Sequence, residues 1–133
     1  MIDVEKPIFT AIADAVHEQF PTLYIVGEEI RVPSTFPTVS VVEADNYTNT
    51  RTSDSGSNEN HVNVMYEVNV FSNKKSGRKT QTKSILSVID ETFIKLGFVR
   101  TMSKPVTMDD ATVYRMIARY TAVISSDGKI YRR

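Results

Sequence analysis

The chain contains no cysteine among its 133 residues. That absence excludes a disulfide framework, a catalytic thiolate and any metal site with cysteine ligands. Only two histidines are present, His17 and His61. His17 lacks a second ligand four residues away, which a helical metal-binding pair would need. We expect both to be ordinary structural or surface histidines.

Neither sign of charge predominates, because 16 basic residues stand against 16 acidic residues. No overall electric field therefore draws the protein to DNA or to an anionic membrane. The uninterrupted apolar runs are only a few residues long, whereas a membrane helix needs about 20. The opening residues MIDVEKP lack the apolar segment of a secretory signal. We expect a soluble protein, assembled in the cytoplasm, without a membrane partner.

Motifs for catalysis and cofactor binding are also missing. The sequence has no G-x-G-x-x-G fingerprint and no phosphate-binding loop. Its acidic pairs are adjacent residues, which point in different directions on a strand or a helix, so none forms a natural carboxylate dyad. These pairs are Glu28-Glu29, Asp90-Glu91 and Asp109-Asp110. We expect no enzymatic activity, no cofactor and no metal.

The clearest pattern in the chain runs from His61 to Phe98. Side chains alternate over His61–Phe71, which predicts a strand with one buried face and one mostly polar face. After a short basic connection, apolar residues recur at helical spacing over Lys79–Leu96. This spacing predicts a helix that covers the sheet, with Gly97 as the residue that ends it.

The remaining elements follow from the same signals. A first helix is expected over about Val4–Phe20, with Asp3 as its N-cap. Asp127-Gly128 is typical of a tight turn, after which the end of the chain forms either a short return strand or a free tail (127–133). The other expected strands are Thr22–Val26, Glu28–Val32, Thr38–Glu43, Phe98–Thr107 and Ala111–Ser125.

Together these elements predict a single α+β domain over residues 1–133, with a mixed, mainly antiparallel sheet flanked by two helices. Residues 44–60 contain almost no apolar side chain beyond Tyr47. They are expected to form a long polar loop at the tip of a hairpin. Loops of that length are usually functional or disordered.

A basic cluster in the connection before the second helix is the first candidate for contacts. Several positive charges so close together could meet DNA phosphates or an acidic partner surface. The alternative is a solvated turn that helps solubility. The cluster comprises Lys74, Lys75, Arg78 and Lys79.

Two arginines of the last long strand are the second candidate. Arg115 and Arg119 share one face with Ile117 and Val123, and such a mixed surface suits a subunit interface. The alternative is an edge strand whose arginines pair with carboxylates. Glu67 and Asp90 are the acidic residues expected to supply that pairing.

The order of these motifs resembles the tail terminator (tail completion) proteins of long-tailed bacteriophages, especially those in prophages of Gram-positive bacteria. A leading helix precedes a Phe-Pro-initiated strand (Phe36–Val41) and a polar loop. A Tyr-x-Val-x-Val-Phe strand (Tyr66–Phe71) and a basic turn follow. A helix ending Leu96-Gly97-Phe98 then leads to an Arg-x-x-x-Arg-Tyr strand (Arg115–Tyr120). The resemblance covers nearly the full length of the chain.

The resemblance implies a structural virion protein that forms a six-membered ring at the tail–neck junction. Such a ring caps the tail tube, ends its polymerisation and forms the tail-side surface for head joining. The implied partners are further copies of the chain, the tail tube protein, neck (head–tail connector) proteins, the sheath protein of a contractile tail, and passing DNA without sequence specificity. The candidate interface residues are Tyr47, Arg51, Lys74, Lys75, Arg78, Lys79, Arg115 and Arg119.

Two other functions compete with this one. A head-side neck protein, either a joining or a stopper protein, would share the size and the ring but would bind the portal side. A small nucleic-acid-binding module would use the basic cluster at 74–79, although the neutral net charge argues against it.

Overall fold

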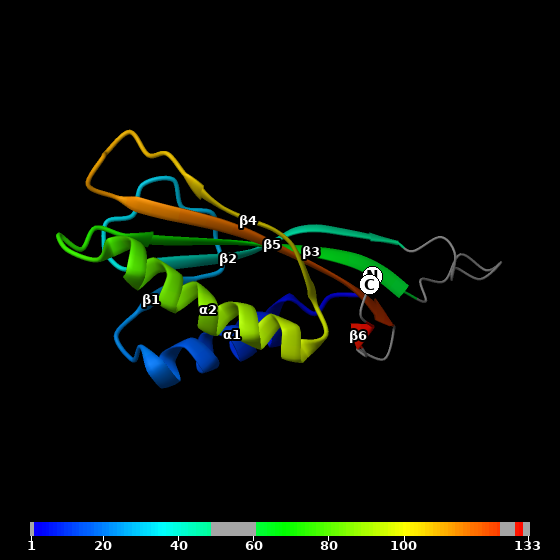
Figure 1. Ribbon diagram of the computed structural model, residues 1–133. Coiled ribbons are helices and arrows are strands. Elements are labelled where there is room, and N and C mark those ends of the chain that lie inside the picture. Colours follow the sequence, from blue (N-terminus) through cyan, green and yellow to red (C-terminus); the bar gives the residue numbers. More distant parts are fainter. Residues whose placement is uncertain (1, 49–60, 126–129, 132–133) are drawn as a thin grey trace.

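The computed structural model describes residues 2–48, 61–125 and 130–131. They form a single α+β domain with one mixed sheet and two helices (Figure 1), as the sequence predicts. The helices are α1 (Glu5–Gln19) and α2 (Arg78–Leu96). The strands are β1 (Tyr24–Val26), β2 (Thr38–Thr48), β3 (His61–Ser72), β4 (Val99–Val106), β5 (Tyr114–Ser125) and β6 (Ile130–Tyr131).

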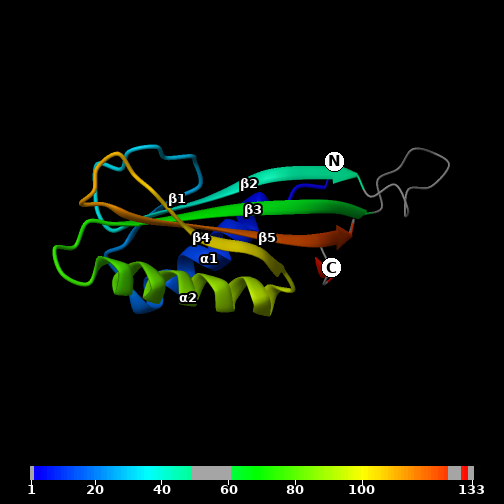
Figure 2. The same cartoon turned by 45° about the horizontal axis from the view of Figure 1, so that its top comes forward.

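The sheet has the strand order β1-β2-β3-β5-β4, and β6 also pairs with β5. Strand β1 runs parallel to β2, and the other paired strands are antiparallel. Both helices lie on the same face of this sheet, as Figures 1 and 2 show. Helix α2 packs on β3, β4 and β5, and α1 packs against α2. The opposite face of the sheet carries no helix, and we call it the open face.

The core lies between the helices and the sheet. Alternate residues of β3 and β5 point toward the helices and are buried, which is the pattern that the period of a strand demands. Four aromatic residues pack together here. Phe93 of α2 stacks on Tyr120 with 4.4 Å between ring centroids, and the rings of Tyr66 and Phe98 contact Phe93 and each other.

The helix ends agree with the expectations except at one position. Val4, not Asp3, is the N-cap of α1, while the Asp3 carboxylate accepts a hydrogen bond from the Glu5 N–H at 3.1 Å. Gly97 ends α2 with a φ of 106°, a left-handed conformation that glycine adopts most readily.

Two expectations about the first half of the chain are wrong. Residues Glu28–Val32 do not form a strand, because the chain leaves the sheet after β1. Pro33, which follows them, is buried. Residues Ala44–Thr48 are not loop but the second half of β2, since their backbone pairs with β3. The rest of the expected loop, 49–60, lies outside the described residues.

The end of the chain returns to the sheet. Ile130 and Tyr131 pair with Ile124 and Val123 of β5, so the return strand is formed. The expected turn at Asp127-Gly128 lies outside the described residues. None of the helices in the described part of the chain is long and apolar enough to cross a membrane.

Candidate interaction surface

The open face consists of every second residue of the central strands, as the strand register defines it. Its residues are Thr38, Ser40, Val42, Asp45 and Tyr47 of β2, His61, Asn63, Met65, Glu67, Asn69 and Phe71 of β3, and Arg115, Ile117, Arg119, Thr121, Val123 and Ser125 of β5. Apolar, polar and charged side chains alternate over this surface. Its composition is therefore neither that of a core nor that of an ordinary solvated face.

An ion pair occupies the centre of the open face. The Nε of Arg119 donates to Glu67 Oε2 at 3.1 Å, and the two residues lie directly opposite each other on β5 and β3. Their side chains are 43% and 26% exposed. Such a partly exposed cross-strand pair stabilises the sheet by about 0.2–1 kcal/mol. The predicted alternative, in which an arginine pairs with Glu67, is confirmed for Arg119, but β5 is an inner strand rather than an edge.

Asp90, the other expected acidic partner, lies on the helix side of the sheet. It pairs with Arg100 at 3.1 Å and accepts a hydrogen bond from the Tyr120 hydroxyl at 2.8 Å. Asp90 therefore holds α2 to β4 and β5, and neither Arg115 nor Arg119 reaches it.

Arg115 has a different environment from Arg119. Its Nε donates to Asn69 Oδ1 at 2.9 Å, and its guanidinium lies 5.2 Å from the centre of the Phe71 ring. A cation over an aromatic ring at this distance is favourable. Nη1 lies 3.9 Å from the sulfur of Met108. No carboxylate of the described residues forms an ion pair with Arg115.

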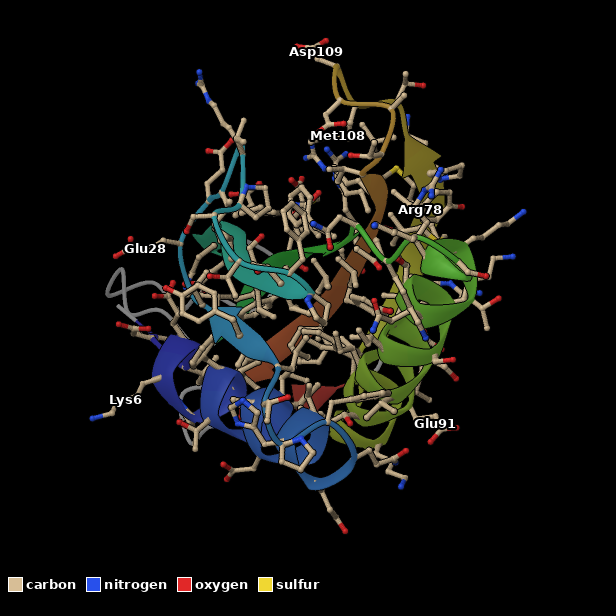
Figure 3. All side chains as sticks on the ribbon, turned by 90° about the vertical axis from the view of Figure 1, so that its left-hand side faces the viewer. Lys6, Glu28, Arg78, Glu91, Met108 and Asp109 are labelled. Atoms are coloured by element: carbon tan, nitrogen blue, oxygen red, sulfur yellow. The ribbon has the colours of Figure 1, made fainter. Side chains whose placement is uncertain are left out.

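Two connections cover this end of the open face. The β1–β2 connection (27–37) contains a cis peptide bond between Phe36 and Pro37, and the β4–β5 connection spans 107–113. Figure 3 shows the β4–β5 connection, with Met108 and Asp109, on the far side of the sheet from the helices. Asn69 and Phe71 are buried at this end, and Arg115 contacts both of them. The alternation of β3 places both residues on the face that was expected to be mostly polar.

Between the two connections lies a cleft of about 500 Å³ with Arg115 as part of its lining, which we call the Arg115 cleft. Half of the lining residues are apolar, and the charged ones are two arginines and two aspartates. The lining consists of Arg31, Val32, Pro33, Phe36, Thr107, Met108, Asp109, Asp110, Val113 and Arg115. The volume falls within the range of about 300–1,000 Å³ that is typical of ligand pockets.

The sequence did not predict this cleft. The β-branched residues near Val32 favoured a strand, and the packing of one connection against another is not visible in a local pattern. The signal available was Pro33 and Pro37, which bracket a rigid corner, together with the turn-forming Asp109-Asp110 pair. The Asp110 carboxylate accepts hydrogen bonds from the backbone and the hydroxyl of Thr112, and these bonds lower the pKa of Asp110.

The other predicted contact residues do not gather at one place. Two lysines of the basic cluster, Lys74 and Lys75, are exposed in the connection between β3 and α2. Arg78 begins α2 and is half-buried, and Lys79 is exposed in the first turn of that helix. Tyr47 is 46% exposed near the end of β2, at the opposite end of the open face from Arg115. Arg51 lies outside the described residues. The exposed lysines are Lys74, Lys75 and Lys79.

A carboxyl cluster lies on the helix side of β2. The pKa of Glu43 is raised from 4.5 to about 7. Burial is the main cause, a hydrogen bond from Asn46 opposes the shift, and the neighbouring Glu5 and Asp3 contribute to it. Asn46 also donates to the carbonyl of Ile2 at 2.9 Å. The segment that leads into α1 is thereby held against β2.

His17 makes a structural contact. Its Nε2 lies 2.9 Å from the carbonyl oxygen of Leu23, so this nitrogen is the donor. The bond ties the last turn of α1 to the residue before β1. Over residues 2–48, 61–125 and 130–131, no group of three or more side chains is arranged to hold a metal ion.

Compared with models of known protein families and with curated protein sequences, the chain matches none of them.

Proposed function

We propose that this chain is a structural virion assembly protein of the tail terminator class, and not an enzyme. Copies of it form a ring that caps a phage tail tube, ends tube polymerisation and presents the tail-side surface for head joining. This places the protein in the virion, at the junction of tail and neck. The order of sequence motifs motivates the proposal, and the open face of the sheet is the observation that carries it.

The open face supports a role in assembly because of its composition. Half-buried apolar side chains such as Val42, Met65 and Val123 share this face with the Arg119–Glu67 pair. Arginine, methionine and tyrosine are enriched in protein–protein interfaces. A surface of this kind gains stability when a partner covers it, while its charged pair keeps a free subunit soluble.

The two faces of the domain also suit a ring. One face is covered by helices with solvated outer surfaces, and the other is a broad sheet (Figure 2). A head-to-tail ring needs two different surfaces on each subunit, because one surface of each copy meets the other surface of its neighbour. The domain offers such chemically distinct surfaces within a small chain.

Electron microscopy tests the proposal most simply. Purified protein is imaged alone and after mixing with tail tubes assembled from the tube protein of the same phage or prophage, with mass from light scattering. Rings seated at one end of the tubes support a terminator. Rings that ignore tubes and bind portal complexes would instead identify a head-side neck protein.

Nucleic-acid binding is the competing function from a different class, and the exposed Lys74, Lys75 and Lys79 are the observation that favours it. A DNA-binding module of this type loses affinity steeply as salt rises, with a slope of about −0.9 per phosphate neutralised. Titration of duplex DNA at several salt concentrations therefore separates the two functions. We expect weak binding by the free protein, since the net charge is zero.

A further inference from the structure

The Arg115 cleft contains a cation that lacks an ionic partner. Arg115 is half-buried, and its Nε donates a hydrogen bond to Asn69. Among the described residues, no carboxylate forms an ion pair with Arg115. Arg31, which also lines the cleft, forms no ion pair with a described carboxylate either. A guanidinium in this position binds a carboxylate well, because its remaining N–H donors form charge-assisted hydrogen bonds. The apolar walls would accept an apolar side chain beside that carboxylate.

The opposite end of the same face carries a matching pair of side chains. Asp45 and Tyr47 are exposed neighbours on β2, and neither takes part in an ion pair or ring contact within the described chain. A β-bulge between Glu43 and Asp45 shifts the register of β2. The bulge turns Asp45 toward the open face, where a regular strand would have turned it toward the helices.

Asp45 and Arg115 of one copy cannot meet. Asp45 lies opposite Met65 of β3, and Arg115 lies opposite Phe71. Those two β3 residues are six positions apart, so the sheet separates them by about 20 Å. One end of this rigid surface therefore carries a carboxylate beside an aromatic ring, and the other carries a cleft whose Arg115 has no ionic partner among the described residues.

We propose that the Arg115 cleft binds Asp45 and Tyr47 of a second copy of this chain, with the Asp45 carboxylate on the Arg115 guanidinium and the Tyr47 ring against Val32 and Phe36. Residues two apart on a strand lie on one face about 7 Å apart. The cleft, at about 500 Å³, is large enough to take both side chains. The Arg115 guanidinium, which lacks an ion pair among the described residues, and the exposed Tyr47 ring together favour this occupant over a free small molecule.

This contact is head-to-tail, and it rests on the proposed function because that function requires self-assembly. Each copy offers one cleft and one Asp45–Tyr47 end. In the proposed arrangement these two sites bind two different neighbours, so each added copy leaves a cleft or an end for the next; if both sites bound the same neighbour, a closed twofold dimer would form instead. Such a heterologous contact closes into a ring when its rotation allows closure. The contact thus places both ring surfaces on the open face, at its two ends, and not one on the sheet and one on the helices.

Charge exchange between two variants is the first test. Asp45→Arg places two arginines in the contact, and Arg115→Asp places two aspartates there, so each variant alone should associate about a hundredfold more weakly than the native protein. An equal mixture of the two should regain association, because copies can alternate with every contact again a pair of opposite charges. Sedimentation velocity measures the masses, and thermal unfolding checks that each variant is folded. If the mixture is as monomeric as either variant alone, the proposal is wrong.

Cysteine cross-linking is the second test, and it leaves Arg115 unchanged. The chain has no native cysteine, so each single variant, Val32→Cys or Tyr47→Cys, carries one thiol. In a mixture of the two variants, a disulfide can therefore join either two unlike copies, as intended, or two like copies. Val32 is 82% exposed, which makes its replacement harmless to the core. We expect mild oxidation of the mixture to yield the Val32–Tyr47 heterodimer in excess. The matched control pairs Tyr47→Cys with Ser84→Cys on the outer side of α2. Equal yields from both mixtures would contradict the proposal.

The outcomes separate this contact from the proposed function. If the Asp45→Arg and Arg115→Asp variants still cap tubes, the proposed contact is wrong, while the terminator function still holds. If the mixed variants assemble but the native protein does not cap tubes, the contact is supported and the terminator function is wrong.

Discussion

Tyr66 and Tyr120 lie directly opposite each other on β3 and β5, and both side chains are fully buried, yet within the described part of the chain only one of the two hydroxyl groups has a hydrogen-bond partner. The Tyr120 hydroxyl donates to Asp90 at 2.8 Å. The Tyr66 hydroxyl has no hydrogen-bond partner among the described residues. Burial raises the pKa of both phenols above the ordinary value of 10, so both are neutral.

Because only the Tyr120 hydroxyl has a partner among the described residues, replacing each tyrosine with phenylalanine should change the free energy of unfolding differently. Tyr120→Phe removes a hydrogen bond to a charged group and should lower the free energy of unfolding by about 1–2 kcal/mol. Tyr66→Phe removes a buried hydroxyl without a partner and should leave stability unchanged within about 0.5 kcal/mol, or raise it. Urea unfolding of the two variants measures the difference. Equal losses in both variants would show that the Tyr66 hydroxyl is also bonded.

Glu43 should make stability depend on pH. Its pKa is raised to about 7 in the folded protein, while the unfolded chain titrates near 4.5. The folded state therefore holds more protons between these values, and stability falls as pH rises from about 4.5 to about 7. After allowance for solvent screening, the loss is on the order of 1 kcal/mol. Glu43→Gln should flatten this part of the profile, as measured by unfolding at several pH values. If the stability of Glu43→Gln falls with pH as steeply as that of the native protein, another group causes the pH dependence.

Gly97 and Gly77 provide a matched pair for the return strand β6. Both have positive φ values, 106° and 81°, so an alanine at either position is strained by about 1 kcal/mol. At Gly97 a Cβ atom would also lie 3.0 Å from Cγ2 of Ile130, whereas nothing lies within 4 Å at Gly77.

Gly97→Ala should therefore destabilise the protein more than Gly77→Ala, by about 1 kcal/mol, because overpacking adds to the strain. Adding Ile130→Ala to the Gly97→Ala variant should remove part of the excess, as a double-mutant cycle will show. Identical effects at the two glycines would mean that β6 does not rest against Gly97 in solution.

The Arg119–Glu67 pair should show a small, salt-dependent coupling energy. A double-mutant cycle with Arg119→Ala and Glu67→Ala is expected to give about 0.2–1 kcal/mol, decreasing at high salt because exposed charges are screened. Coupling well above this range would indicate that the pair is more buried in solution, as it would be inside an assembly. Repeating the cycle at low and high protein concentration distinguishes these cases.

The sequence predicted the elements whose signals are local. The alternation of β3 and the helical spacing of α2 predicted both elements to within a residue of their bounds, His61–Ser72 and Arg78–Leu96. Gly97 was identified as the end of α2 because its left-handed conformation is a local requirement. The α+β architecture followed from these patterns.

The errors arose where distant parts of the chain decide the structure. Residues 44–48 are polar and lack a strand signal, but pairing with β3 overrides their weak propensity. The segment around Val32 has β-branched residues, yet it folds over the open face and forms one wall of the Arg115 cleft. Arg115 was identified as a candidate contact residue, but the cleft around it depends on two connections that are about 75 residues apart, a relationship that local patterns do not encode.

Tube elongation is the most direct test of the central claim, which is that this chain ends the growth of a tail tube. Preformed tubes are incubated with the protein, fresh tube subunits are added, and tube lengths are measured by electron microscopy. We predict that tubes treated with the protein keep their original length, with a ring at one end, while untreated tubes lengthen. Tubes that lengthen equally with and without the protein would contradict the account.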